Sequence, residues 1–218
     1  MRREYLKKSL ALLSAVIVSD RLWAQSQAST TPPQNSGVTF KPYLEVPSVD
    51  GEENMVRVFF SPSCPFSKQY FHFFMNLAAT LPKSKEFRMS PLVNKLDGPT
   101  YILGYLAVQR YYPRYLKNYI EASLIGVQEK GMSPKNWYAI EKIAAAAQIP
   151  TRLGPLVQEN QSRLKADFSN LVSLQKKLKI TNTPSVAVAG TYIVTPEITD
   201  GDPQLFSELV NGVISMAM

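Results

Sequence analysis

A long helical stretch interrupts a chain whose other parts alternate between strand and helix patterns, and this order restricts the folds open to it. Residues 55–61 form a short apolar run rich in β-branched and aromatic residues, which predicts a buried central strand. Apolar residues at helical spacing follow over residues 66–77, and residues 87–90 are a candidate second strand. With 45% hydrophobic and 19% charged residues, the chain has the composition of a globular protein, so a disordered or fibrous chain is excluded.

The helical stretch runs from about residue 97 to residue 179, and residues 153–178 have the spacing of one long amphipathic helix. The pattern then returns to period two in residues 185–189 and 191–195, which flank Gly190 like the strands of a hairpin. A last helix follows the hairpin. The order therefore predicts an α/β fold that contains a helical insertion.

The first 28 residues have the features of a secretory signal peptide. A nine-residue, mostly apolar stretch at residues 10–18 is too short to span a bilayer comfortably, and small residues allow cleavage after Ala28. The basic residues before this stretch are Arg2, Arg3, Lys7 and Lys8. Because the opening also resembles a twin-arginine signal, either that route or the general one would export the chain to the periplasm. The alternative for this segment is an uncleaved N-terminal anchor. Residues 29–40, which follow it, are predicted to form a polar leader.

Charge and residue counts exclude several kinds of function. The net charge is +7 for the full chain and +4 for the residues after position 28, without a concentrated basic patch, so nucleic acid is not an expected partner. No later run is apolar enough to span a membrane, so we expect no stable membrane insertion after signal removal. One cysteine and one histidine cannot form an internal disulfide or a zinc site of the Cys/His type, so no metal is expected.

Cys64 is the one residue whose position suggests covalent chemistry. It follows the predicted buried strand and lies in the first turn of the predicted helix, with Ser63 as the expected N-cap and Pro65 in the first turn. Unpaired backbone N–H groups and the helix dipole at such a position favour the thiolate, which is the reactive form. The alternative is a buried cysteine that acts as a small hydrophobic residue.

Three segments together resemble the DsbA-type thiol-disulfide proteins of the thioredoxin superfamily. They are Phe59-Phe60-Ser61, Cys64-Pro65 and, far downstream, Thr183-Pro184-Ser185-Val186. The resemblance covers about residues 40–215. It implies a sheet of four or five strands with flanking helices and an all-α domain inserted after the second strand.

The resemblance divides the chain and assigns roles to the downstream segment. It implies a thioredoxin-like fold with an inserted α-helical domain: residues 41–96 as its first part, 97–179 as the insertion and 180–218 as its second part. It also implies that Pro184 is a cis-proline beside Cys64, and that Thr183 offers backbone groups to an extended substrate. An ordinary turn before a strand is the alternative for these two residues.

The active-site motif departs from the family pattern. The family has two cysteines separated by two residues, whereas this chain has Cys64-Pro65-Phe66-Ser67, and Val58 stands where many members have a buried acid. A chain with one thiol cannot donate its own disulfide and can form only mixed disulfides. We expect Pro65 and Phe66 to contact substrate and Ser67 to donate a hydrogen bond to the Cys64 thiolate, unless Ser67 faces solvent.

Other readings of the same cysteine fit less well. Cys-Pro-Phe-Ser also resembles the glutathione-binding turn of glutaredoxin-like and omega-type glutathione transferase proteins, but there the cis-proline follows within some tens of residues, whereas 120 residues separate Cys64 from Pro184. A peroxiredoxin would have a proline where Arg57 stands. His72 lies two turns beyond Cys64, too far to act as its base, so a surface or structural role is expected.

The aromatic and basic residues between positions 101 and 119 could stack on nucleic acid, but their helical spacing favours packing within the insertion.

These observations predict an exported DsbA-like monothiol protein that acts as an isomerase, mixed-disulfide carrier or chaperone. Its partners would be unfolded or cysteine-containing exported proteins, with no cofactor and with glutathione as a candidate co-substrate. We expect an apolar groove around Cys64, Phe66 and Thr183, extended by Pro62 and Tyr192; Phe66 packed into the core is the alternative. The alternative function is a non-enzymatic peptide-binding or assembly module of a secretion or conjugation apparatus.

Overall fold

Five strands form one mixed sheet in the computed structural model, which describes residues 41–217. The order across the sheet is β1-β5-β4-β2-β3. β2 is parallel to β3 and antiparallel to β4, and the other pairs are antiparallel. The strands are β1 (Leu44–Glu45), β2 (Met55–Phe60), β3 (Glu86–Pro91), β4 (Ser185–Val188) and β5 (Tyr192–Val194). The sequence patterns predicted all of them except the two-residue β1, which is too short to produce a periodic signal.

β2 is the buried central strand that its composition predicted. All six of its residues are buried, and β3 and β4 flank it on both sides. Because β-branched and aromatic side chains pack well on both faces of a covered sheet, this run favours a strand in the core. Arg57 is the one charged residue in it, and its guanidinium forms a bidentate ion pair with Glu52 and donates to the Ser90 hydroxyl.

The helix after the Cys64 turn is broken once. The sequence predicts one helix over residues 66–77, whereas the structure has α1 (Pro65–Gln69) and α2 (Phe71–Thr80), separated at Tyr70. The Tyr70 ring is buried against Phe206 of α8 (Pro203–Met216), and its hydroxyl donates to the Gly201 carbonyl. These tertiary contacts hold the chain in place at the break between the two helices.

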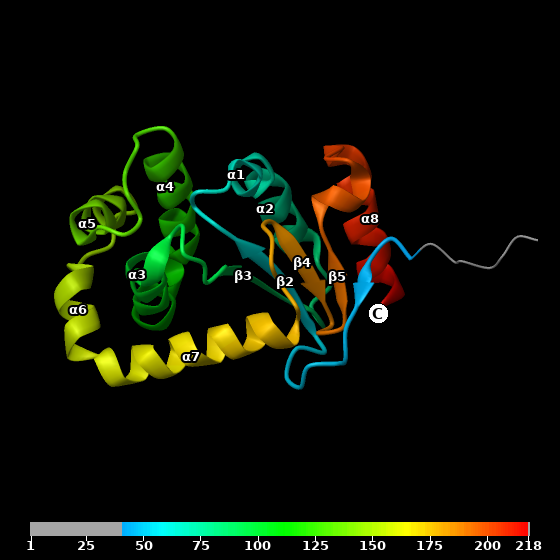
Figure 1. Ribbon diagram of the computed structural model, residues 1–218, viewed down its shortest axis with the longest axis horizontal. Helices are drawn as coiled ribbons and strands as arrows, with labels where there is room; N and C mark the ends of the chain where they lie inside the picture. Colours follow the sequence, from blue (N-terminus) through cyan, green and yellow to red (C-terminus); the bar gives the residue numbers. More distant parts are fainter. Residues whose placement is uncertain (1–40, 218) are drawn as a thin grey trace, which may run out of the picture. The chain divides into compact units, whose positions relative to one another are not determined.

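The helical insertion lies between β3 and β4, as predicted, and Figure 1 shows its helices grouped beside the sheet, with α7 leading back to it. Its elements are α3 (Gly98–Tyr111), a short 3-10 helix η1 (Pro113–Tyr115), α4 (Leu116–Gln128), α5 (Trp137–Ala146), α6 (Leu153–Glu159) and α7 (Gln161–Lys177). A second 3-10 helix, η2 (Pro196–Thr199), precedes α8. The fold is therefore a thioredoxin-like sheet with an inserted α-helical part, as the sequence predicted.

The long helix predicted over residues 153–178 is also broken. The structure divides it into α6 and α7 at Asn160, whose amide nitrogen donates to the Leu156 carbonyl and whose amide oxygen accepts from the Tyr111 hydroxyl. Asparagine readily forms such local side-chain bonds to the backbone, and these compete with helix continuation. The prediction of one continuous helix was wrong because hydrophobic spacing does not register this competition.

Three tyrosines between positions 101 and 119 pack inside the insertion, as their spacing predicted. The rings of Tyr101 and Tyr119 stack with centroids 5.9 Å apart, and the Tyr101 hydroxyl bonds with that of Ser123. Tyr105 is also fully buried, and its hydroxyl donates to the Met89 carbonyl of β3. These residues therefore hold the insertion together and attach it to the sheet.

The predicted signal peptide and polar leader lie outside the described residues. Within residues 41–217, none of the helices combines the length and the apolar character that crossing a membrane requires.

Candidate functional site

The turn that carries Cys64 is held by two hydrogen bonds in which Ser61 is the acceptor. The Ser61 carbonyl accepts from the Cys64 N–H at 3.1 Å, and the Ser61 hydroxyl accepts from the Ser63 N–H at 3.2 Å. α1 then begins with Pro65 at its first position, and Cys64, not Ser63, is the N-cap residue. The cap prediction was one residue early because the Ser61 bonds extend the turn past Ser63.

The sheet brings the Thr183-Pro184 segment to Cys64. β4 pairs antiparallel with β2 so that Ser185 lies opposite Phe59, and the residues before Ser185 therefore lie where β2 leads into the Cys64 turn. The Thr183–Pro184 peptide bond is cis, and the Cys64 thiol donates to the Thr183 carbonyl at 3.0 Å. The predicted placement beside Cys64 is confirmed.

The backbone of Thr183 is only partly free. The sequence predicts that the carbonyl and the N–H of Thr183 are both free to bind a substrate, but the carbonyl accepts a hydrogen bond from the Cys64 thiol. Among the described residues the Thr183 N–H has no hydrogen-bond acceptor. Pro184 is buried, whereas Thr183 and Cys64 are half-buried. A strand-like ligand could therefore accept from this N–H at once and would compete with the thiol for the carbonyl.

Ser67 lies under the turn and not in solvent. Its side chain is fully buried, and its hydroxyl oxygen accepts from the Ser61 N–H at 3.1 Å. No hydrogen bond joins Ser67 to Cys64 in the part of the chain that the structure describes, so its bond to the thiolate stays a prediction. The hydroxyl proton is not used in its bond to Ser61, which leaves Ser67 able to donate.

Phe66 is exposed, as the groove prediction requires. Its side chain is 48% exposed, and Pro65 beside it is exposed as well. The other two residues assigned to the groove were placed wrongly. Pro62 is buried in the turn, and Tyr192 lies opposite Val188, at the end of the β4–β5 pair away from Ser185. The alternating pattern of a strand shows in the sequence which side of the sheet a side chain faces. Its distance from a site on another strand depends on how the two strands are aligned, which the pattern does not show.

A cavity of about 390 Å³ opens beside Cys64. Its lining includes Thr183, Leu92 and Leu96, and the Leu96 side chain is 62% exposed. Sequence reasoning missed Leu96. The available signal was a leucine with polar neighbours, Asn94-Lys95 before it and Asp97 after it.

Gln128 is a second residue that the sequence did not single out. It is the last residue of α4, and its side-chain amide donates to the carbonyls of Pro62 and Cys64 at 2.9 Å and 3.0 Å. Nearby, Lys68 of α1 forms an ion pair with Glu129 at 2.5 Å. The inserted helices therefore hold the Cys64 turn directly.

Other groups that could take part in chemistry are distant or already engaged. His72 is exposed on α2 and packs its ring against Phe71, as a surface role predicts. Val58, which stands in the place of the family's buried acid, is fully buried. Within residues 41–217, no cluster of three or more His, Cys, Asp or Glu side chains could hold a metal ion.

The architecture and the site define a class. A mixed sheet with a lone-cysteine turn after its central strand, a cis-proline loop against that turn and helices inserted between β3 and β4 is a thioredoxin fold with a helical insertion.

Solved DsbA structures have the same architecture. The oxidoreductase DsbA from Xylella fastidiosa superposes with a TM-score of 0.65 at 20% identity, covering 80% of this chain and 94% of that one. Pseudomonas aeruginosa DsbA gives a TM-score of 0.65 at 14% identity, over 81% and 94%. A Cys→Ser variant of Proteus mirabilis DsbA, solved with a non-covalently bound peptide, gives 0.66 at 16% identity, over 82% and 96%. No protein-family model matches the sequence, and neither does any curated protein. The resemblance to DsbA is thus confirmed at the level of the fold.

Proposed function

We propose that this protein is an exported monothiol protein of the DsbA type, which forms mixed disulfides through Cys64 with exported proteins or with glutathione. The observation that carries the proposal is the contact between the Cys64 sulfur and the Thr183 carbonyl beside the cis-proline, in a chain without a second cysteine. A single thiol in this position supports disulfide exchange but not net oxidation.

The exchange is balanced without an external oxidant. The Cys64 thiolate attacks one sulfur of a client disulfide, a bond forms between the two sulfurs, and the client's own S–S bond breaks. The released client sulfur leaves as a thiolate and takes up a proton. A second thiol, from the client or from glutathione, then attacks the mixed disulfide and releases Cys64 in reduced form. The client disulfide is thereby rearranged or transferred with no net oxidation.

The surface around Cys64 suits an extended, apolar client segment. Thr183 offers a free backbone N–H, and Phe66 and Leu96 expose apolar area near the sulfur. An exposed apolar patch with an unpaired backbone donor suits a segment that adds as a strand does. The peptide bound to the Proteus mirabilis DsbA variant supports this choice of ligand by analogy.

Mass spectrometry of the intact protein tests the chemistry. Reduced wild-type protein incubated with oxidised glutathione should gain one glutathione by mixed disulfide, and Cys64→Ser should gain none. The wild-type protein should also rearrange the disulfides of a client with scrambled disulfides in the presence of glutathione. Repeated oxidation of a reduced dithiol protein without glutathione would refute the monothiol proposal.

A second assay separates covalent capture from apolar holding. If the groove holds clients, wild type and Cys64→Ser should suppress aggregation of a reduced, unfolding client equally, and Phe66→Ser and Leu96→Ser should suppress it less. Leu205→Ser is the matched control, because Leu205 is a 51% exposed leucine of α8 outside the cavity beside Cys64. If Phe66→Ser changes nothing while Cys64→Ser abolishes suppression, capture by the sulfur is the mechanism.

The alternative is a peptide-binding assembly module in an export or conjugation apparatus. The free Thr183 N–H and the exposed Phe66 beside Cys64 favour it, because they could bind an extended segment whether or not the thiol reacts. The pH dependence of Cys64 alkylation distinguishes the two functions. Rapid alkylation near pH 7 supports exchange chemistry, and reaction only at alkaline pH supports the module. The periplasmic location is tested by cell fractionation with and without residues 1–28.

A further inference from the structure

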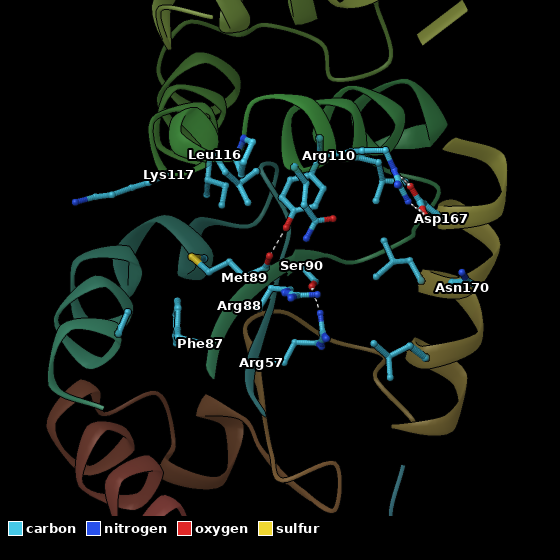
Figure 2. A pocket seen from close by; sticks show the side chains of 18 of the residues that line it. Arg57, Phe87, Arg88, Met89, Ser90, Arg110, Leu116, Lys117, Asp167 and Asn170 are labelled. Carbon is cyan, nitrogen blue, oxygen red and sulfur yellow. Dashed lines mark hydrogen bonds and ion pairs between the residues drawn. The ribbon is translucent and has the colours of Figure 1, made fainter. Parts of the chain in front are cut away.

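A second cavity, larger than the one beside Cys64, lies at the outer edge of β3 and away from the thiol. Its volume is about 770 Å³, and it is bounded by α2, α3, α4 and α7 (Figure 2). β3 is the last strand of the sheet, so one side of its backbone has no neighbouring strand. Such an edge presents hydrogen-bonding groups that can pair with another chain.

The hydrogen bonds show which residues of β3 face outward. The Glu86 N–H donates to Asn54 at 2.8 Å and the Leu92 N–H to Phe60 at 2.7 Å, so the even-numbered positions bond toward β2. Because backbone groups alternate in direction along a strand, Phe87 and Met89 direct theirs away from the sheet.

The insertion occupies only one half of this edge. The Tyr105 hydroxyl donates to the Met89 carbonyl, and the Gln175 amide pairs with both the N–H and the carbonyl of Val93, at 2.9 Å and 3.3 Å. The N–H and carbonyl of Phe87 and the N–H of Met89 have no partner within residues 41–217. These unpaired groups lie on residues that line the cavity.

The two faces of the edge differ in character. Phe87 shares its face with Met89, and the α2 side of the cavity is apolar, with Met75 and Ala78. On the other face Arg88 lies beside Arg57, its register partner on β2, and Figure 2 shows this pair between β3 and α7.

The charges that remain in the cavity after internal pairing are positive. Arg57 is paired with Glu52, and Arg110 is paired with Asp167 at 2.6 Å. Arg88 has only a distant carboxylate, Glu86 at 4.0 Å. Lys117 has no ion-pair partner in the described part of the chain.

We propose that this cavity binds an extended segment of a partner polypeptide, which adds to β3 as a sixth strand and carries alternating apolar and acidic side chains. The backbone of the segment would pair with the N–H and carbonyl of Phe87 and with the N–H of Met89, whose carbonyl stays bonded to Tyr105. Its apolar side chains would face Met75 and Ala78, and its acidic ones would face Arg88. Because α2, α3, α4 and α7 all border the cavity, we expect it to admit a single strand and not the sheet edge of a second folded copy. The site is separate from Cys64, and none of its lining residues belongs to the cavity beside the thiol.

Peptide binding measured by fluorescence anisotropy tests the proposal. The probe is a labelled peptide of about eight residues in which glutamate and valine alternate. We expect it to bind wild type and Cys64→Ser equally, which separates this site from the proposed thiol chemistry. The same peptide with N-methylated backbone amides should bind at least about tenfold more weakly, because it cannot pair as a strand. A peptide with lysine in place of glutamate should also bind more weakly.

Variants of the protein locate the site. Phe87→Pro removes an outward N–H that the sheet does not use, and should lower affinity about tenfold relative to Phe87→Ala, which loses the ring but keeps the N–H. Arg88→Glu should lower it at least about threefold. Equal binding of the N-methylated peptide overturns the proposal and does not depend on any variant folding. No binding up to about 1 mM, or self-association of the protein that Phe87→Pro abolishes, overturns it as well.

Discussion

Replacement of Gln128 by leucine tests whether the inserted helices position the Cys64 turn. Leucine has a similar size but no donors, so the carbonyls of Pro62 and Cys64 lose hydrogen bonds of 2.9 Å and 3.0 Å. A hydrogen bond contributes about 0.5–1.5 kcal/mol net, so two would contribute about 1–3 kcal/mol. Gln128 is half-buried, and water can partly replace the lost donors, so we expect a loss of about 1–2 kcal/mol in the free energy of unfolding.

Urea denaturation measures this loss, and the rate of Cys64 alkylation in the native state measures the looser turn. We expect the leucine variant to be alkylated faster at each pH. Gln158→Leu is the matched control, because Gln158 is an exposed glutamine of the same insertion whose side chain has no hydrogen bond to any described residue. A Gln128→Leu variant that unfolds at the same urea concentration as wild type and is alkylated at the same rate would refute the positioning role.

Three further predictions concern the buried pair, the missing thiol and the buried tyrosines. Glu52→Ala leaves the Arg57 guanidinium buried without its carboxylate, so we expect a loss of about 3 kcal/mol in urea denaturation, and Glu52→Ala combined with Arg57→Met should recover much of it. Ser67→Cys should form a disulfide with Cys64 under a glutathione redox buffer, detected as the loss of both free thiols; two thiols that stay free would contradict the turn geometry. Burial raises the pKa of three tyrosines above the ordinary value of about 10, so the stability they contribute is complete below pH 10 and is lost as pH rises further. These tyrosines are Tyr101, Tyr105 and Tyr119. The midpoint of urea unfolding should therefore fall steeply above pH 10, and a midpoint that does not change with pH there would contradict this.

The sequence alone determined the elements whose signal is local. A run of β-branched and aromatic residues became β2, the hairpin around Gly190 became β4 and β5, and the helical stretch became the insertion. The presence of only one cysteine in the sequence means that an internal disulfide cannot form. The exposure of Phe66 also agreed with its place early in a helix. These inferences depend only on periodicity, side-chain chemistry and residue counts, which sequence displays directly.

The tertiary structure decided how distant segments meet. Strand register places Thr183 at Cys64, where its carbonyl accepts from the thiol and is not free for a ligand. The contacts of Gln128 with the turn, and the half-open edge of β3, depend on where the insertion packs. Such contacts depend on the relative placement of elements separated by many residues, and hydrophobic periodicity carries no information about that placement.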